Sequence, residues 1–407
     1  MSRQLNVYLC GNKIGVLHED ELLQLSFRYF SVDVLPLSVK LPVRINEYSH
    51  DYIYPFLENL VPEGDAFGIL TKDHVSGNRI FSFLDRFGGD CAGAVAFYDT
   101  EPIKSINGLH KIPSDKLVHI IDKLPEDPLL TSLKNPPRLS LAGAQSKFAI
   151  YKLDNQYYRS DDEHPTTHII KIASNRFPDL LVNELFCMRL AQIMQLDVPD
   201  IELKEVLKRP YLEIKRFDRY IEKENIFRIH QEDFCQALGI VSNKKYQTGG
   251  GASLRDCLKI IESFSENPLS DITRFIEWII FNYLIGNTDA HAKNLSLLHA
   301  KTGITLSPFY DLLSTEVYSE KIVDHQMAML INGKGKYNSL KPEDFIVFFG
   351  QLGLNATNMM KSIKYKFADV VSIAENLCET NKILSAKKSV CEDIISIINK
   401  RISKITN

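Results

Sequence analysis

Polar side chains able to do chemistry gather in one short stretch directly after an apolar run. The run FIEWIIFNYLI ends at residue 285, and GNTDAHAKN follows it at 286–294. A helix that only buries an apolar face ends in a turn without such a set. The stretch supplies amides, a carboxylate, an imidazole and an ammonium group from Asn287, Asp289, His291, Lys293 and Asn294. We interpret it as a candidate active site.

The spacing of these residues fits phosphoryl transfer. That reaction uses a carboxylate to orient or deprotonate the attacking hydroxyl, oxygen ligands for Mg²⁺, and a lysine for the phosphates. Asp289 and Asn294 stand in the pattern D-x-x-x-x-N, the spacing of the base and the metal-binding Asn in the kinase catalytic loop. Asp311 follows two apolar stretches and a Thr-Gly turn, a path that predicts a hairpin returning this acid beside Asn294. Mg²⁺ prefers such oxygen ligands.

Blander interpretations of this stretch stay open when it is taken alone. Polar side chains also cap helix C-termini, and an Asp and an Asn at this spacing occur by chance. A metal site on His291 and His299 is disfavoured because no third ligand stands nearby. We interpret His291 as a residue that orders the loop.

Upstream residues could complete a nucleotide site. Lys171 lies in the apolar run HIIKIA, where an unpaired ammonium group is costly, so it favours an anion; an edge-strand lysine facing water is the alternative. Glu184, on the following helical pattern, could pair with Lys171 or be exposed. The small-residue loop in RLSLAGAQSKFAI could cradle phosphates with its backbone N–H groups, or be a plain turn.

The bulk composition is that of an ordinary globular protein with more than one core. The chain has 407 residues, 44% hydrophobic and 24% charged, with a formal net charge of −3. This charge disfavours a free-standing nucleic-acid binder. The seven cysteines lack zinc-type spacing and are expected to be reduced thiols. No signal peptide or membrane span is predicted, so we expect a cytoplasmic protein.

The chain is predicted to start with strands and to end with helices. LNVYLC and KIGVLH predict a hairpin around a Gly-Asn turn, VDVLPLSVKLPV alternates like a strand, and GAVAFYD predicts another short strand. Residues 104–137 are polar and proline-containing, as in a connector with a short helix. SKFAIYKL, THIIKIA and YLEIKRF predict strands around the helical PDLLVNELFCMRLAQIM, and helices dominate from 230 onward.

These motifs, in this order, resemble the HipA-like serine/threonine kinases, the toxins of bacterial type II toxin–antitoxin modules. NLVPEGD (59–65) and FGGDCAGAV (87–95) resemble the N-terminal subdomain of the family. The later segments that follow the family order are SLAGAQSK (140–147), HIIK (168–171), NELFC (183–187), KRFDR (215–219), GNTDAHAKN (286–294) and PFYDLLST (308–315).

The resemblance implies an α+β, bilobal protein-kinase-like fold with an N-terminal β-rich subdomain and a mostly helical C-terminal lobe. The implied divisions are the subdomain at 1–104, a connector at 105–137, the kinase N-lobe at 138–217 and the helical C-lobe at 218–407. Asp289 is implied as the catalytic base, Asn294 and Asp311 as the Mg²⁺ ligands, and Glu184 as the ion-pair partner of Lys171.

The resemblance also implies which residues bind ATP. Lys171 contacts the phosphates, the loop at 142–147 covers them, and 215–217 line the adenine at the hinge, where Lys215 stands in place of an expected acid. The full set of implied nucleotide-binding residues is Ala142, Gly143, Ala144, Gln145, Ser146, Lys147, Lys171, Lys215, Arg216, Phe217, His291, Lys293, Asn294, Tyr310 and Asp311.

Function and partners follow as expectations from the same resemblance. The chain is expected to phosphorylate a serine or threonine of a translation component such as an aminoacyl-tRNA synthetase, and to cause growth arrest. Ser140 is the implied autophosphorylation site, with Ser146 as the competing acceptor. The expected partner is a HipB-like helix-turn-helix antitoxin, through which DNA is contacted indirectly. Two alternatives stay open: a small-molecule kinase of the aminoglycoside or choline type, and a catalytically dead binding module.

Overall fold

The chain folds into two compact units. The computed structural model describes residues 2–63, 77–102, 110–127, 130, 138, 145–160, 164–222 and 225–406. The first unit comprises Met1–Ile172, Lys204–Ser242 and Ser296–Ile304, and the second comprises Ala173–Leu203, Asn243–Leu295 and Thr305–Asn407. The domain boundaries inferred from the sequence stay a prediction.

An antiparallel sheet opens the first unit, with strand order β3–β2–β1–β4. Its strands and the helices that share its core are β1 (Arg3–Leu9), β2 (Asn12–Glu19), β3 (Leu25–Tyr29), α1 (His50–Glu58), α3 (Arg79–Phe87) and β4 (Val95–Tyr98). Alternating apolar residues such as Leu5, Val7 and Phe27 bury one face against these helices. The predicted β1–β2 hairpin and the strand in GAVAFYD are confirmed.

The prediction of a strand in VDVLPLSVKLPV is wrong. Residues 32–43 form an irregular segment with a bridge between Ser38 and Leu41. Pro36 and Pro42 lack the N–H group that a strand donates. The Tyr29 hydroxyl instead donates to the Leu41 carbonyl at 2.6 Å. It also accepts from the backbone N–H of residue 37 at 2.7 Å. Side-chain hydrogen bonds thus replace a ladder there.

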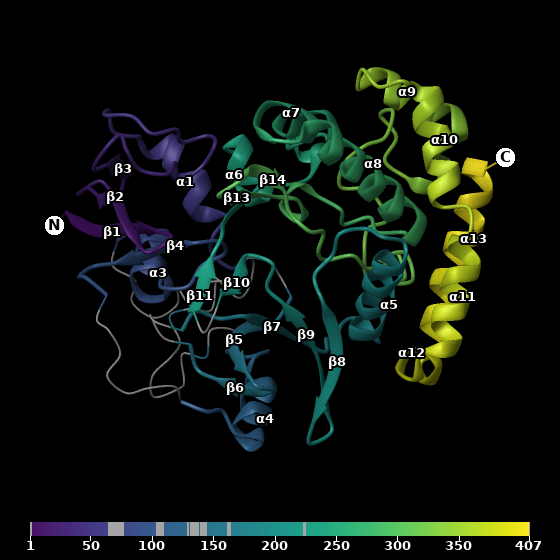
Figure 1. Ribbon diagram of the computed structural model, residues 1–407, viewed down its shortest axis with the longest axis horizontal. Coiled ribbons are helices and arrows are strands. Elements are labelled where there is room, and N and C mark those ends of the chain that lie inside the picture. Colours follow the sequence, from purple (N-terminus) through teal and green to yellow (C-terminus); the bar gives the residue numbers. More distant parts are fainter. Residues whose placement is uncertain are drawn as a thin grey trace. The chain divides into compact units, whose positions relative to one another are not determined.

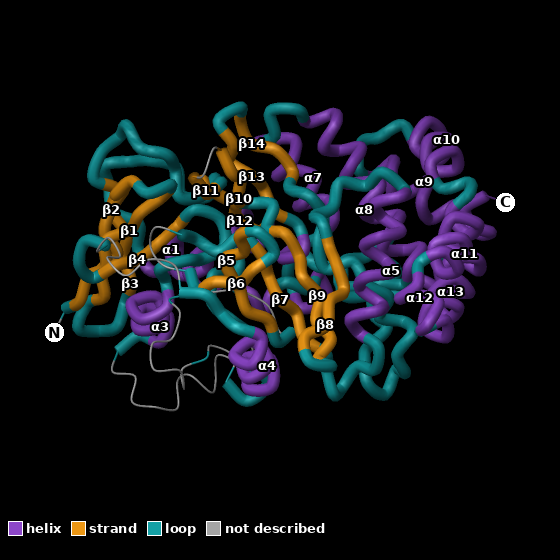
Figure 2. Tube along the Cα trace, turned by 60° about the horizontal axis from the view of Figure 1, so that its bottom comes forward, coloured by secondary structure: helices purple, strands orange, loops and turns teal. Residues whose placement is uncertain are grey.

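A second sheet has the strand order β6–β5–β7–β9–β8 (Figure 2). It contains β5 (Lys147–Leu153), β6 (Gln156–Tyr158), β7 (His168–Ile172), β8 (Ile201–Val206) and β9 (Arg209–Lys215), and α4 (Ser114–Lys123) accompanies it. Leu117 and Ile120 of α4 share a core with Phe148 of β5 and Ile170 of β7. The short helix expected in the connector and the strands expected in SKFAIYKL, THIIKIA and YLEIKRF are therefore confirmed.

Short elements follow this sheet along the chain. They are β10 (Arg219–Glu222), β11 (Asn225–Arg228), β12 (His230–Asp233), α6 (Phe234–Leu238), β13 (Ser296–Ala300) and β14 (Gly303–Leu306). β10 pairs with β11, and the remaining strands form a sheet in the order β12–β13–β14. The predicted hairpin after the polar stretch corresponds to β13 and β14.

The second unit is mostly helical (Figure 1). Its helices are α5 (Leu180–Ile193), α7 (Leu254–Phe264), α8 (Pro268–Ile285), α9 (Pro342–Gln351), α10 (Ala356–Lys366), α11 (Val370–Thr380), α12 (Lys382–Ala386) and α13 (Lys388–Thr406). Short 3₁₀ turns are η1 (Ser242–Lys244), η2 (Gln247–Gly249), η3 (Ala292–Asn294) and η4 (Tyr337–Ser339). α8 packs against α7 and α13, and α5 packs against α11 and α13. Among the described helices, none combines the length and apolarity needed to cross a bilayer.

Candidate active site

The polar stretch begins where α8 ends, at Gly286. This residue adopts φ +76°, the left-handed conformation that terminates many helices and that favours glycine. A Cβ atom at this position would lie 3.0 Å from Arg401 Nη1 and 3.2 Å from Glu316 Cβ. Arg401 also donates to the Tyr283 carbonyl at 2.5 Å, placing a cation at the negative end of the α8 dipole. The helix end is therefore fixed by both backbone and packing.

Neutral side chains hold the first half of the stretch. Asn287 Nδ2 donates to Asn282 Oδ1 of α8 at 2.7 Å, and the Asn287 carbonyl accepts from the Tyr337 hydroxyl at 2.7 Å. The Thr315 hydroxyl accepts from the Thr288 N–H at 2.7 Å and donates to the carbonyl of residue 286 at 3.0 Å. These residues are buried, so the loop has a defined backbone conformation.

Asp289 projects from this fixed loop with half of its side chain exposed. Its backbone N–H donates to Asn287 Oδ1 at 3.2 Å. Oδ1 of its carboxylate accepts from the Tyr246 hydroxyl at 2.6 Å and lies 3.9 Å from His291 Nε2. A carboxylate held on a rigid loop yet open to solvent can accept a proton from an incoming hydroxyl.

Two hydrogen bonds involve the residues predicted to bind Mg²⁺ or their neighbours in the chain. Asn294 Nδ2 donates to the Asp289 carbonyl at 3.0 Å, which leaves Oδ1 as the ligand atom of the amide. The Tyr310 hydroxyl donates to the Lys293 carbonyl at 2.7 Å, so the residue before Asp311 contacts the residue before Asn294. This hydrogen bond joins the two segments, and the return of Asp311 beside Asn294 stays a prediction.

The donor set fits a hard cation. An amide oxygen and a carboxylate are among the ligands that Mg²⁺ takes from proteins, with phosphate oxygens and water completing its shell. Asp311 adopts φ +54°, a conformation that costs a non-glycine residue energy and that clusters at functional sites. Within the described residues, no group of three His, Cys, Asp or Glu side chains is placed to hold a metal. Asn294 and Asp311 are the residues that fit.

His291 and Lys293 are both buried in the same loop. The His291 N–H donates to the Asp289 carbonyl at 2.9 Å, and its own carbonyl accepts from the Asn294 N–H at 2.9 Å. Its ring packs edge-on against Tyr246. These contacts are those of a residue that orders the loop.

In the first unit, Lys171 lies on β7 with 4% of its surface exposed. β7 pairs with β5 on one side and β9 on the other, so the alternative of an edge-strand lysine facing water is wrong. Lys171 stands directly opposite Lys147 of β5. Because Ile170 and Phe148 face α4, alternation places both lysines on the other face of the sheet. Like charges directly opposite each other favour negatively charged groups nearby.

The segment 215–217 begins with a lysine that lies on the opposite face of the sheet from Lys171 and Lys147. Lys215 is exposed and pairs with His168, on the face of the sheet that carries α4. Its side chain therefore points away from the face of Lys171. Phe217 is half-buried and follows β9. A contact of Lys215 with adenine would have to use its backbone.

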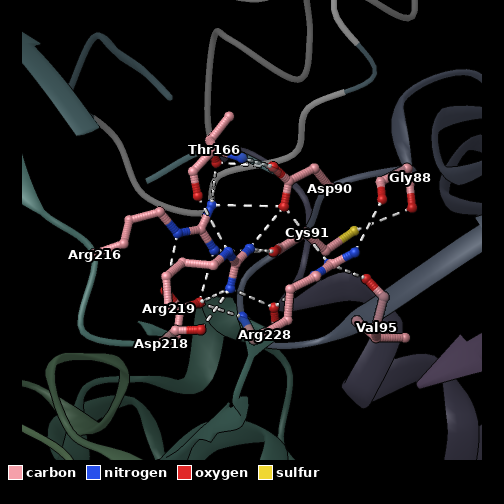
Figure 3. Close-up of polar contacts among 11 residues, drawn as sticks. Gly88, Asp90, Cys91, Val95, Thr166, Arg216, Asp218, Arg219 and Arg228 are labelled. Atoms are coloured by element: carbon pink, nitrogen blue, oxygen red, sulfur yellow. Dashed lines mark hydrogen bonds and ion pairs between the residues drawn. The ribbon is translucent and has the colours of Figure 1, made fainter. Parts of the chain in front are cut away.

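Arg216 belongs to a buried ion cluster (Figure 3). Its guanidinium donates to Asp218 Oδ2 at 2.7 Å and to Thr166 Oγ1 at 2.8 Å. Arg219 donates to Asp90 Oδ1 at 2.7 Å, and Arg228 lies 3.6 Å from the same oxygen. The Arg216 side chain is thus bound within this buried cluster. Any contact of Arg216 with a nucleotide would therefore also have to use its backbone.

The arginines of this cluster keep its acids ionised. Burial alone would raise the pKa of Asp90, but Arg219 and Arg216 lower it well below its usual range. Burial likewise opposes ionisation of Asp218, and Arg216 with Arg219 lowers its pKa to about 2. Both carboxylates are therefore charged at neutral pH and bonded to cations.

Four of the remaining predicted residues fall outside the described part of the chain. Ser140, Ala142, Gly143 and Ala144 lie outside the described residues. Gln145 and Ser146, both half-buried, lead into β5. Glu184 is fully buried on α5, so its exposure to solvent, the alternative considered from the sequence, is wrong. Its ion pair with Lys171 stays a prediction, because the two residues belong to different units.

The sequence analysis missed the residues that support the loop. Tyr246, Thr315 and Tyr337 contact the loop through side-chain hydroxyls. Tyr246 and Tyr337 come from segments distant in sequence, and a lone Tyr carries no spacing signal. Thr315 ends the motif PFYDLLST, so its segment was identified but its contact with the loop was not. Asn282 also supports the loop from within α8, where a polar residue in FIEWIIFNYLI was a usable hint.

The fold and this loop define an α+β kinase-like protein. The HipA N-terminal domain model matches residues 5–98, and the HipA-like C-terminal domain model matches residues 139–380. The chain is 35% identical to a putative kinase, Y4mE, of Sinorhizobium fredii over 92% of this chain and 93% of that one. It is 30% identical to the serine/threonine-protein kinase toxin HipA of Shewanella oneidensis over 84% and 83% of the two chains.

This chain is also similar to a solved structure from the same family. The chain superposes with a TM-score of 0.83 on a chain from the complex of Shewanella oneidensis MR-1 HipA, HipB and operator DNA, covering 98% of each chain at 25% identity. The chain belongs to the family of HipA-like kinases.

Proposed function

We propose that the chain is an ATP- and Mg²⁺-dependent kinase that phosphorylates a serine or threonine of a protein. The observation that carries this proposal is the loop at 286–294. It holds Asp289 half-exposed on a hydrogen-bonded backbone, with Asn294 bonded to the Asp289 carbonyl and Tyr310 bonded to the Lys293 carbonyl. Phosphoryl transfer needs such positioning more than covalent chemistry.

Each candidate residue has a role in this proposal. Asp289 orients the acceptor hydroxyl and takes its proton. Lys171 and Lys147 bind phosphate oxygens from the face of the second sheet opposite α4. Asn294 and Asp311 would hold Mg²⁺, which neutralises charge on the transferring phosphate when bound. Glu184 would pair with Lys171 and orient it.

The test is phosphate transfer from labelled ATP, with and without cell lysate. We expect Asp289→Asn to lose transfer by at least about a hundredfold, the lower end of what general base catalysis contributes. The matched control is Asp122→Asn, the same change at an exposed acid paired with Arg209. Equal transfer by Asp289→Asn and the control contradicts the proposal. Labelling of choline or an aminoglycoside without any labelled protein would favour a small-molecule kinase.

We further infer that the chain acts as the toxin of a toxin–antitoxin module. The relative from Shewanella oneidensis is named a kinase toxin, and the matched structure contains HipB and operator DNA. A helix-turn-helix antitoxin similar to HipB is the proposed partner, and the net charge of −3 suits a chain that reaches DNA through that partner. The proposed substrate is a translation component such as an aminoacyl-tRNA synthetase. Phosphoproteomics after brief induction, comparing wild type with Asp289→Asn, tests this substrate.

Self-inactivation at Ser140 completes the proposal and rests on the family resemblance. If the loop at 142–147 covers the ATP phosphates, as the resemblance implies, a phosphate on Ser140 adds about −1.5 to −2 charges close to them. We expect purified protein with Mg-ATP to gain one phosphate at Ser140 and then to lose nucleotide affinity. Mass spectrometry that finds Ser146 modified in place of Ser140 overturns this site.

A further inference from the structure

A tyrosine from outside the loop contacts the proposed catalytic base. The Tyr246 hydroxyl donates to Asp289 Oδ1 at 2.6 Å across 43 positions of sequence. This length is that of an O–H···O⁻ bond to a charged oxygen, which is stronger than a neutral hydrogen bond. The Tyr246 ring also packs edge-on against His291, with the ring centroids 5.4 Å apart at an interplanar angle of 81°. Tyr246 therefore touches the loop at two residues.

The backbone beside Tyr246 is fixed to the same scaffold as the loop. The Gln247 N–H donates to the Ala328 carbonyl at 2.8 Å, and Gln247 Oε1 accepts from the Leu330 N–H at 2.7 Å. The Ala328 N–H in turn donates to the Thr288 carbonyl at 2.8 Å. Residues 246–247, 328–330 and 288 thus form one hydrogen-bonded network.

The glycine run after Tyr246 makes this anchoring possible. The Gly249 and Gly251 N–H groups donate to the Tyr246 carbonyl at 3.1 Å and 3.2 Å. A Cβ atom at Gly251 would lie 1.7 Å from the Lys244 carbonyl oxygen, so a side chain cannot be accommodated there. The chain turns tightly back on itself and presents the tyrosine ring toward the loop.

We propose that Tyr246 is a positioning residue that orients the Asp289 carboxylate for the acceptor hydroxyl. The terminal torsion of an aspartate is broad, and half of this side chain is exposed, so packing alone does not fix it. The bond from Tyr246 fixes Oδ1 and leaves Oδ2 to accept the proton of the substrate. This inference rests on the proposed function of Asp289 as the base.

The competing interpretation is that Tyr246 acts as a gate that blocks the acceptor hydroxyl. In that case the Tyr246 hydroxyl occupies the place of the acceptor, and its removal speeds transfer. The hydrogen bonds of the Tyr246 carbonyl and of Gln247 favour a fixed residue over one that swings away. The two interpretations predict opposite changes in rate.

The experiment compares wild type with Tyr246→Phe, using the full chain and a protein acceptor from lysate. We expect kcat to fall about tenfold, because a base slightly misplaced loses much of its effect. KM for ATP and the urea unfolding curve should stay at the wild-type values. The control is Tyr365→Phe, which removes a hydroxyl from a side chain that is 89% exposed.

A second measurement separates positioning from a structural role. In an Asp289→Asn background, Tyr246→Phe should lower the residual rate no further, because it acts through the carboxylate. An unchanged or raised kcat in the single variant, or an additive loss in the double variant, overturns the inference while the proposed function stands. Absence of transfer by the wild-type protein overturns the proposed function and this role with it.

Discussion

Replacing Asp90 by asparagine should strongly destabilise the first unit. Asp90 Oδ2 accepts from both the N–H and the hydroxyl of Thr166 at 2.8 Å, and Oδ1 accepts from Arg219 at 2.7 Å. The shape of asparagine is the same, but one of its terminal atoms is a donor. That NH₂ group would face either Thr166 or Arg219, which are themselves donors.

The magnitude follows from burial and charge. The Arg216 and Arg219 side chains are each 2% exposed. In the cluster drawn in Figure 3, these two residues and Arg228 share the carboxylates of Asp90 and Asp218, so the substitution leaves one acid for the arginines. Breaking a buried ion pair from one side costs about 3–5 kcal/mol. A typical domain is stable by about 5–15 kcal/mol, so the loss should be readily measured.

The cluster also predicts how stability depends on pH. The Asp218 pKa falls from its usual 3.8 to about 2 in the folded protein, because the attraction of Arg216 and Arg219 exceeds the opposing effect of burial. A lowered folded-state pKa contributes stability that is present above pH about 4 and lost as the pH falls toward 2. This contribution is about 2 kcal/mol at neutral pH. The Asp90 pKa is lowered as well, so its loss occurs in the same acid range.

Urea unfolding followed by circular dichroism at pH 7 and pH 3 measures both effects. Hydrogen exchange of peptides from β7 and β9 locates the loss in the first unit. The control is Asp122→Asn, where Arg209 and Asp122 form an exposed pair at 2.7 Å that should matter little. If Asp90→Asn costs no more than this control, or keeps the full acid dependence of the wild type, the attribution of stability to the buried cluster is refuted.

Three further predictions concern the site and its partner. Asp311→Ala should abolish Mg²⁺-dependent transfer because a carboxylate near the metal stabilises charge in the transition state, and near-normal transfer by the folded variant contradicts this role. Arg401→Met should lower the unfolding free energy of the second unit by about 3–5 kcal/mol, because it leaves the Glu316 carboxylate, whose side chain is only 10% exposed, without its cation. Adding Glu316→Gln should recover most of the loss, as followed by Trp278 fluorescence. The isolated chain should bind DNA weakly and salt-sensitively, gaining operator affinity with a helix-turn-helix partner; sequence-specific nanomolar binding by the chain alone contradicts this.

Local sequence patterns predicted much of the fold. Short strand-like runs identified β5, β7 and β9, and the apolar run FIEWIIFNYLI followed by polar residues identified the end of α8. The same patterns placed Lys171 in a strand, because a charged residue inside an apolar run is itself a signal. These features depend on neighbours within a few positions, which is the information a single sequence holds.

The failures occurred where distant residues decide the structure. Alternation predicted a strand at 32–43, but the prolines there prevent a ladder. Ser38 and the backbone N–H of Val39 instead donate to the buried carboxylate of Glu232, a residue far along the chain. The ion cluster of Arg216 was also invisible, because Asp90 and Thr166 approach it only in the folded unit. Neither arrangement has a local signature.

In the polar stretch after α8, neutral side chains fix the backbone and Asp289 provides a half-exposed charge. Asn287 and Thr288, both neutral and buried, hold the backbone through hydrogen bonds between uncharged groups. The charged Asp289 is left half-exposed, held by the loop backbone and by the hydroxyl of Tyr246. A site organised this way is fixed before substrate arrives, so the free energy of binding need not reorganise it. Amides and hydroxyls gather beside the acid because they can support a carboxylate without neutralising it.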